Sequence, residues 1–444
     1  MTQTTTSPIK EDIFLSKILQ QRPDAPTDKL DKETGEWLTN LREQAASWVS
    51  RLNVPTKKEE EWRFTDISEI SDLDIVSPTP KKHSFEVEIH EMVDILPEAE
   101  DTRLVFVNGA YSEVLSKTSG LPEGIYVGNL TNLPEAYCKY FRPFLGTVPG
   151  KEEVFTSLNT ASISDVAIIW AAPNTVVEKP IHLLFVSLYN DDPDSITVTQ
   201  PRSWFVAERN SQLTIVEEYI GSANYLTNAV TEVFLGENAQ INHTRLQQEA
   251  QKAYHIGKTA VSQKKDSRYT LTEINLGGKL SRHNPEVYQD GEQTETNLNG
   301  LTVAKDKQTA DTHSIIQLNH PYGTTDQLHK CLVKDRAHSV FNGKVFVPKP
   351  AQLTNASQLN RNLLLSPKAR VDTKPELQIT ADNVKCSHGA TVSQLEPDEI
   401  FYLRSRGLSE DDARQLLINA FITEIIERIP VESVRKSIQT TVSN

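Results

Sequence analysis

The sequence predicts a mainly β protein whose two ends are helical. From about residue 165 to 395, short runs rich in β-branched and aromatic residues follow one another without helical periodicity between them. The beginning and the end of the chain instead carry apolar residues at three-to-four spacing, which is typical of amphipathic helices. We therefore expect a mixed, largely helical region at residues 1–155, a β core at 156–395 and a helical region at 396–444.

Within residues 1–155, a helix is predicted first and strands later. The helix carries one apolar stripe, formed by Trp37, Leu41, Ala45, Trp48 and Leu52. Phe85, Val87 and Ile89 alternate with glutamates, which is the period of a strand. The apolar run at residues 104–107 ends at Asn108-Gly109, a dipeptide that favours a hairpin turn.

The β core is predicted from short runs that turn residues separate. These runs lie at residues 166–170, 181–188, 204–206, 213–216, 230–235, 269–274, 328–333, 340–347, 377–379 and 384–388. Turn signals such as Gly277-Gly278 and Asn299-Gly300 stand between them. No fixed-period repeat is evident, so periodicity alone leaves a sandwich, a propeller and a β-solenoid open.

The end of the chain predicts two helices. Ser409, followed by three acidic residues, is a good helix start; Pro430 marks the end of that helix, and a second one starts near Val431. The first of them carries a wide apolar face that includes Leu416, Leu417, Phe421 and Ile425. This face either packs on the chain's own β core or docks a partner, and the pattern alone favours packing.

Composition and missing motifs exclude several classes of function. Asp and Glu number 60 against 46 Lys and Arg, a net charge of -14, which argues against a nucleic-acid partner. The longest apolar run, residues 166–173, is too short to span a membrane, and the N-terminus lacks a signal-peptide core. With three scattered cysteines, a cytoplasmic protein is expected. No phosphate loop, dinucleotide fingerprint or hydrolase motif occurs, so we expect no enzyme and no catalytic residue.

The histidines and two of the cysteines predict no metal site. His313, His320 and His329 lie in one stretch at spacings of 7 and 9, which is not a zinc pattern, and we expect exposed strand or loop positions for them. Cys138 and Cys331 have no ligand at suitable spacing and are expected to be buried and inert.

One short segment pairs a thiol with an imidazole. On a strand, the two-residue period places Cys386 and His388 on one face, about 6.5–7 Å apart at the backbone. Both groups could bind one metal ion, but two ligands do not close a site, so further ligands would have to come from elsewhere, such as a second chain. The structural alternative is a small buried Cys386 beside a hydrogen-bonded His388.

Motifs spread over about residues 55–430 are together similar to one family. They include Pro55-Thr56-Lys57-Lys58-Glu59-Glu60-Glu61-Trp62-Arg63-Phe64-Thr65, Asp311-Thr312-His313, Phe341-Asn342-Gly343-Lys344, residues 382–392 and residues 401–407. This set resembles the SufB/SufD family, subunits of the SUF iron–sulfur cluster assembly machinery. SufB has a Gln-Cys-Asp-Ser type motif where this chain has Asn362-Leu363-Leu364-Leu365-Ser366, and a Glu-His-Glu-Ala-Thr run near Ser387-His388-Gly389-Ala390-Thr391. Lacking that cysteine and both glutamates, the chain resembles the SufD branch.

The resemblance implies a fold and a set of partners. The fold is a right-handed parallel β-helix (solenoid) of about ten coils, at roughly 20–25 residues each. The implied function is a non-catalytic scaffold that pairs with SufB as a heterodimer through the last coils and docks the ATPase SufC on its C-terminal helices. The implied SufC-docking residues are Arg404, Arg406, Leu416, Leu417, Phe421 and Ile425. Whether the isolated chain forms a homodimer is left open.

The resemblance also implies a role for Cys386 and His388 at the SufB interface, in nascent cluster assembly. His388 could be a ligand as neutral imidazole, and Cys386 could be a ligand, a sulfur relay or a protected interface thiol. No cofactor is expected to bind tightly to this chain alone, and an iron–sulfur cluster is transient in the complex. The alternatives are a β-helix enzyme acting on polysaccharide and an inert structural adaptor.

Overall fold

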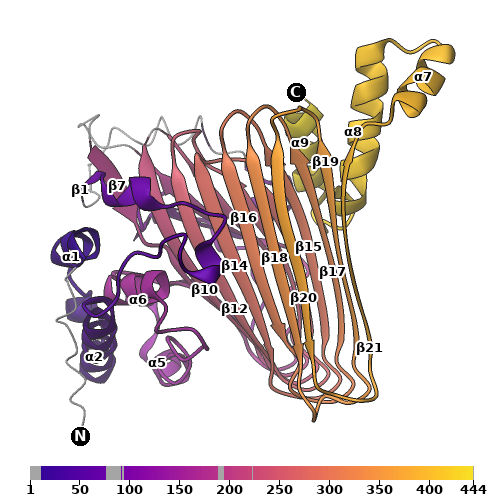
Figure 1. Cartoon of the computed structure of the whole chain (residues 1–444). Helices are drawn as coiled ribbons and strands as arrows, with labels where there is room; N and C mark the ends of the chain where they lie inside the picture. The colour runs from indigo at the N-terminus through magenta and orange to yellow at the C-terminus, as the bar shows by residue number, and fades with distance from the viewer. Residues whose placement is uncertain (1–11, 77–91, 93–94, 189–194, 223, 444) are drawn as a thin grey trace, which may run out of the picture.

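The fold is a parallel β-solenoid of about 7 turns with helices at both ends (Figure 1). The structure is a computed structural model, and it describes residues 12–76, 92, 95–188, 195–222 and 224–443. The mainly β class and the parallel solenoid with helical ends are confirmed. The strand predicted at residues 85–89 lies outside the described residues.

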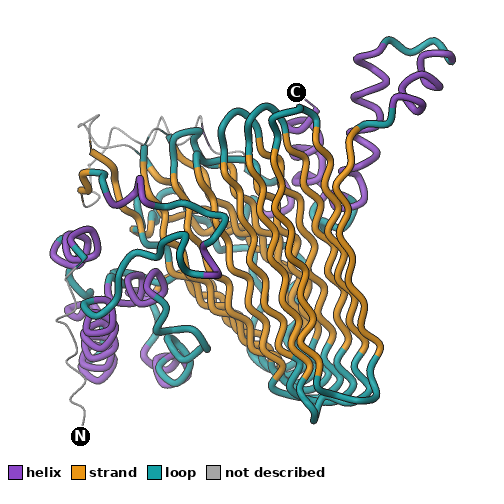
Figure 2. The backbone as a smooth tube through the Cα atoms, viewed as in Figure 1, coloured by secondary structure: helices purple, strands orange, loops and turns teal. Residues whose placement is uncertain are grey.

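Each coil contributes one strand to each of two sheets, which run along the solenoid (Figure 2). Sheet A contains β4 Ile125–Asn129, β5 Ala167–Ala171, β8 Arg202–Ala207, β10 Tyr225–Leu235, β12 Tyr254–Gln263, β14 Leu280–Gln289, β16 Thr309–Gln317, β18 His338–Val347 and β20 Arg370–Ile379, with β1 Asp74–Val76 and β7 Ser195–Thr199 beside this path. Sheet B contains β2 Arg103–Val107, β3 Ala110–Tyr111, β6 Ile181–Ser187, β9 Gln212–Gly221, β11 Gln240–Gln248, β13 Arg268–Asn275, β15 Glu295–Ala304, β17 Thr324–Val333, β19 Asn355–Leu364 and β21 Lys385–Gln394.

The helices precede and follow this β-solenoid. Before it or among its first strands lie α1 Ile13–Gln20, α2 Lys32–Val49, α3 Ser68–Ser71, α5 Glu135–Phe141, α6 Val154–Ala161 and the 3-10 turns η1 Thr27–Lys29, η2 Glu60–Trp62, η3 Pro97–Ala99 and η4 Leu130–Asn132. After it lie α7 Pro397–Ser405, α8 Glu410–Ile426 and α9 Glu432–Ser443. None of the helices described here is long and apolar enough to cross a membrane.

The coils are longer and less regular than the sequence analysis assumed. In sheet A, Tyr254 pairs with Leu280, an advance of 26 residues, whereas His338 pairs with Arg370, an advance of 32. The prediction of about ten coils is therefore wrong, because each coil holds two strands of about ten residues plus two corners. The varying coil length also explains why no fixed repeat is visible in the sequence.

One corner of each coil from β8 to β18 is made by a residue in the left-handed backbone conformation. The residues, with φ between 53° and 63°, are Asn210, Asn238, Asp266, Gln293, Tyr322 and Leu353. Their N–H groups donate to the corner of the next coil, as in the 2.9 Å bond from Asn238 N to Lys265 O. Asparagine and aspartate adopt this conformation readily, whereas Tyr322 and Leu353 adopt it at a cost in free energy.

The interior of the solenoid contains a buried network of charged side chains. Glu217, Arg245 and Glu273 occupy one register position on β9, β11 and β13. The carboxylate of Glu217 lies 3.1 Å from His243 Nε2, and that of Glu273 lies 3.1 Å from His283 Nδ1. Burial favours a raised pKa for Glu217, but His243 and Arg245 outweigh burial and lower its pKa to about 2. These partners allow charged groups to occupy a solenoid interior.

The terminal helices pack on the sheets with one difference from the predicted pattern. α2 buries Leu38, Arg42, Ala45 and Val49, while the predicted Trp37, Leu41 and Trp48 lie half-buried at the margins of that stripe. Ser409 caps α8 as predicted, since its side chain accepts a hydrogen bond from Asp412 N. α9 confirms the second helix predicted near Val431.

Candidate functional site

The solenoid ends in two strands that each have one unpaired edge. Within the part of the chain that the structure describes, β21 pairs only with β19, and β20 pairs only with β18. Most residues of β21 are exposed, whereas β17, two coils earlier in the same sheet, is almost entirely buried. Apolar side chains stay uncovered here, with Val392 52% and Ile379 37% exposed. This open end, formed by β20 and β21, has the backbone donors and acceptors that another strand could pair with.

Cys386 and His388 lie on this open end, on the same face of β21. They align with Ala356 and Gln358 of β19. Ala356 belongs to the solenoid core. The side chain of Gln358 crosses the interior toward Gly343 of β18. Its Nε2 would lie only 2.3 Å from a Cβ atom placed on that glycine. Residues aligned across a parallel pair share one side of the sheet, so Cys386 and His388 both face the interior at its open mouth.

The two side chains differ in exposure and neither belongs to a closed metal site. Cys386 is half-buried against the core cluster, and burial raises the pKa of its thiol. His388 is exposed. Among the described residues, no group of three or more His, Cys, Asp or Glu side chains could hold a metal ion. The pair is therefore at most a partial ligand set within this chain.

The other two cysteines are buried away from this end. Cys331 lies on β17 inside the solenoid, and burial raises its pKa to about 11. Cys138 lies on α5, and burial also raises its pKa. Both thiols are shielded and protonated at neutral pH, so they are poor nucleophiles and poor ligands.

The expected exposure of the clustered histidines is wrong for two of them. His329 is 3% exposed inside the solenoid, where its Nε2 lies 3.0 Å from Thr302 Oγ1. His313 is 8% exposed on β16 and lies between Asp311 and Glu61. The expectation failed because the partners of these histidines come from other coils and from the N-terminal region.

The α7–α8 hairpin extends away from the solenoid (Figure 1). Its tip exposes Phe401, Tyr402 and Leu416, at 73%, 56% and 49%. Arg404 and Arg406 are exposed beside them, and the Arg406 guanidinium lies 5.3 Å from the centre of the Tyr402 ring. Phe401 and Tyr402 were not predicted as docking residues, because a helix with aromatic residues next to arginines shows no clear apolar stripe.

The base of α8 packs on the solenoid. Ile425 is fully buried in one cluster with Leu301 and Leu328 of sheet B, so it lies in the chain's own core and not on a surface. Phe421 is half-buried and lies under the Lys330 ammonium, 4.8 Å from its ring centre. Leu417 is half-buried as well. The apolar face of α8 thus divides into a packed base and a free tip.

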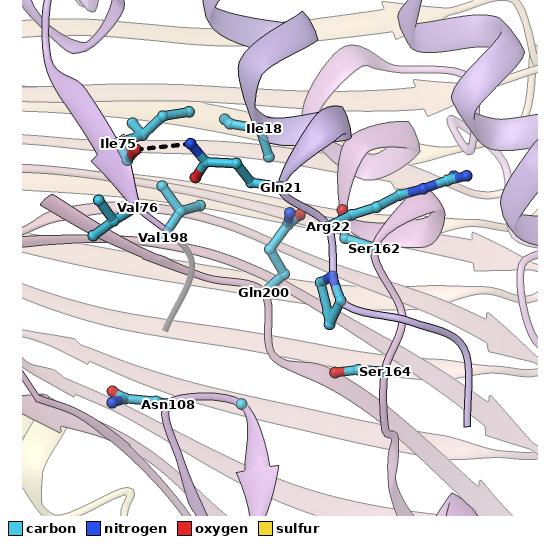
Figure 3. Close-up of a pocket in the computed structure, with 12 residues that line it drawn as sticks. Ile18, Gln21, Arg22, Ile75, Val76, Asn108, Ser162, Ser164, Val198 and Gln200 are labelled. Atoms are coloured by element: carbon cyan, nitrogen blue, oxygen red, sulfur yellow. Dashed lines mark hydrogen bonds between the residues drawn. The ribbon is translucent and has the colours of Figure 1, made fainter. Parts of the chain in front are cut away.

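A small pocket lies at the opposite end of the molecule, between α1, β1 and β7 (Figure 3). Gln21 Nε2 donates a 3.1 Å hydrogen bond to Ile75 O at its rim. Its volume of about 40 Å³ suits water molecules and no cofactor. We assign it no chemical role.

Comparisons with known proteins agree with this architecture. A sequence model described as "SUF system FeS cluster assembly, SufBD core domain" matches residues 188–421, and one described as "SufBD protein N-terminal region" matches residues 22–183. A SufBD family iron–sulfur cluster assembly protein of Synechocystis is 47% identical over 99% of both chains. Protein ABCI7, chloroplastic, of Arabidopsis thaliana is 39% identical over 90% of this chain and 84% of its own. SufD of Escherichia coli is 28% identical over 89% and 90%.

The fold defines a β-solenoid protein, and the comparisons place it in the iron–sulfur cluster assembly class. The chain belongs to the SufB/SufD family of the SUF system. Its role is therefore in SUF iron–sulfur cluster assembly.

Proposed function

We propose that this chain is a non-catalytic scaffold subunit that pairs with a SufB subunit through the open end of its solenoid. The observation that carries the proposal is the pair of unpaired edges on β20 and β21, together with the uncovered Val392 and Ile379. An end that exposes both backbone hydrogen-bonding groups and apolar side chains is stabilised when a second solenoid end covers it.

Cys386 and His388 complete a site that the two subunits share. Each faces the mouth of the interior, and the chain itself offers no third ligand beside them among the described residues. The nascent cluster is the cargo of this site, and the partner supplies the remaining ligands. The raised pKa of Cys386 keeps its thiol protonated in the isolated chain, and contact with iron would displace that proton.

The free tip of the α7–α8 hairpin binds the ATPase SufC. Phe401, Tyr402 and Leu416 provide exposed apolar area, and Arg404 and Arg406 provide charge beside it. Aromatic residues and arginine are the side chains that contribute most to protein–protein hot spots. Ile425 is left out of this surface because it is buried in the chain's own core.

The test is co-expression of this chain with SufB and SufC, followed by isolation of the complex and measurement of subunit ratios, iron and acid-labile sulfide. We expect the three proteins in one peak with iron and sulfide present, and no ATPase activity from this chain alone. Isolation of this chain without either partner would overturn the proposal.

A further inference from the structure

Residues 55–71 cross the outer face of sheet A and contact successive coils of the solenoid (Figure 1). We call this segment the strap. Glu60 forms a 2.6 Å ion pair with Lys374 of β20, and Glu61 lies 3.6 Å from Lys344 of β18. Further along, Glu69 pairs with Lys279 at the start of β14 and accepts a bond from Tyr254 of β12. The strap therefore links the last coil to earlier ones.

The centre of the strap contacts a cluster of charged groups, in which Asp311, Arg282 and His313 are buried and Glu61 of the strap is exposed. His313 of β16 lies with Nδ1 3.3 Å from Glu61 and Nε2 3.1 Å from Asp311. Arg282 of β14 donates to the Glu61 carbonyl at 2.7 Å and to Asp311 at 2.8 Å. Its guanidinium covers the Trp62 ring at 3.9 Å, and Thr65 donates to Asp311 at 2.5 Å.

We propose that the strap is a conformational latch: its attachment at His313 holds the terminal coil in the register that end-to-end pairing requires, and deprotonation of His313 releases it. Lys374 lies on β20, one of the two strands that form the open end, so the strap reaches the pairing edge directly. The consequence for pairing rests on the proposed function, whereas the latch itself does not.

The charges around His313 give the pH dependence a definite sign. Burial alone would lower the pKa of His313, but the carboxylates of Asp311 and Glu61 outweigh burial and raise it. The Arg282 guanidinium opposes this rise in pKa without cancelling it, and the other nearby cation, Lys344, lies 3.6 Å from Glu61. A raised pKa means that the imidazolium stabilises the latch fully below its ordinary pKa, and that this contribution is lost as pH rises through the raised value.

The carboxylates of Glu61 and Asp311 set how the stability of the latch depends on pH in acid. Hydrogen bonding from His313 lowers the pKa of Glu61 to about 2. Burial would raise the pKa of Asp311, but His313 and Arg282 lower it to about 2. Their contribution is present above their ordinary pKa values and is lost only in strong acid. The latch is therefore strongest below the ordinary pKa of histidine and weakens as pH rises through the raised pKa of His313.

Hydrogen exchange of the full-length chain, corrected for the intrinsic effect of pH, tests the latch. Between about pH 6 and about pH 9, opening of strap and β20 amides should rise several-fold, while amides of β13, which lies in the other sheet, do not change. In the His313→Gln variant, the strap and β20 amides should open at both pH values as much as those of the wild type do at about pH 9. His320→Gln is the matched control, because the described contact of His320 is made by its backbone N–H, and it should behave like the wild type.

Two further variants keep the test decisive. If His313→Gln does not fold, Glu61→Gln removes the same ion pair from the strap side and should give the same exchange. Lys374→Gln should raise exchange in β20 while the strap centre stays protected. The proposal is overturned if wild-type strap exchange does not respond to pH, or if the strap opens and β20 does not. If strap exchange responds to pH but the chain never pairs with SufB, the latch is supported and the proposed function is refuted.

Discussion

Cys386 and His388 lie two residues apart on β21 and face the interior of the solenoid at its open mouth. The thiol is half-buried and the imidazole is exposed, so the two groups lie at different depths of one opening. Under the proposed pairing, a partner that covers this opening would contact the exposed His388 and close Cys386 off from water.

Replacing His388 by alanine should leave the complex intact and lower its cluster content sharply. An exposed polar side chain away from a packed hot spot contributes little to association, whereas loss of a ligand can abolish a metal site. Size-exclusion chromatography followed by iron and sulfide assays on the same peak measures both. Ser387→Ala, its neighbour on the outer face, is the matched control, and equal cluster content in both variants would make His388 a bystander.

Val392→Asp should prevent pairing without destabilising the isolated chain. Val392 is already 52% exposed, so the charge costs little until a partner would bury it. The adjacent Thr391 lies on the other face of β21, and Thr391→Asp should have a much smaller effect. Affinity for SufB and the unfolding midpoint of the single chain are the two measurements. A Val392→Asp chain that pairs normally would show that the partner docks elsewhere.

The free tip of the α7–α8 hairpin and the packed base of α8 should respond differently to side-chain truncation. Phe401→Ala combined with Leu416→Ala removes exposed side chains and should weaken SufC binding with little change in stability. Ile425→Ala creates a cavity under α8 and should cost about 2–5 kcal/mol of the free energy of unfolding. Calorimetric titration with SufC and urea unfolding, each carried out on both variants, separate these effects. Unchanged SufC affinity in the double variant would contradict the assignment of the docking surface.

Leu353→Asn should stabilise the chain. Leu353 has φ 60° and is 47% exposed, so the substitution relieves an unfavourable backbone conformation and loses little burial. We expect a gain of about 0.5–1 kcal/mol, since asparagine tolerates the left-handed region better. The reverse change at the equivalent corner, Asn238→Leu, should lower the unfolding midpoint in urea. A lower midpoint for Leu353→Asn would mean that side-chain packing outweighs backbone strain there.

The sequence predicted those strands whose interior positions are apolar. β6, for example, is an uninterrupted apolar run apart from His182 and Ser187, and it was found. β11, with the sequence Gln-Ile-Asn-His-Thr-Arg-Leu-Gln-Gln, was missed because His243, Arg245 and Gln247 occupy its interior side. Such polar residues become compatible with burial only when partners from neighbouring coils lie beside them, and no local pattern shows those partners.

The same limit applies to the candidate site. Alternation placed Cys386 and His388 on one face, and the register confirms it. Their position at the mouth of the interior depends on the chain having no further coil after β21, which the residues around them do not show. Ile425 was assigned to a docking face because helical periodicity identifies an apolar side but not what covers it.

Pairing through the open end is tested most directly by site-specific photo-crosslinking in the co-expressed complex. A photoreactive amino acid at Val392 should crosslink to SufB, identified by mass spectrometry. The same group at Glu36, which is exposed on α2 at the far end of the chain, should not. Crosslinking to SufB from Glu36 and none from Val392, in a complex that contains all three subunits, would contradict the account.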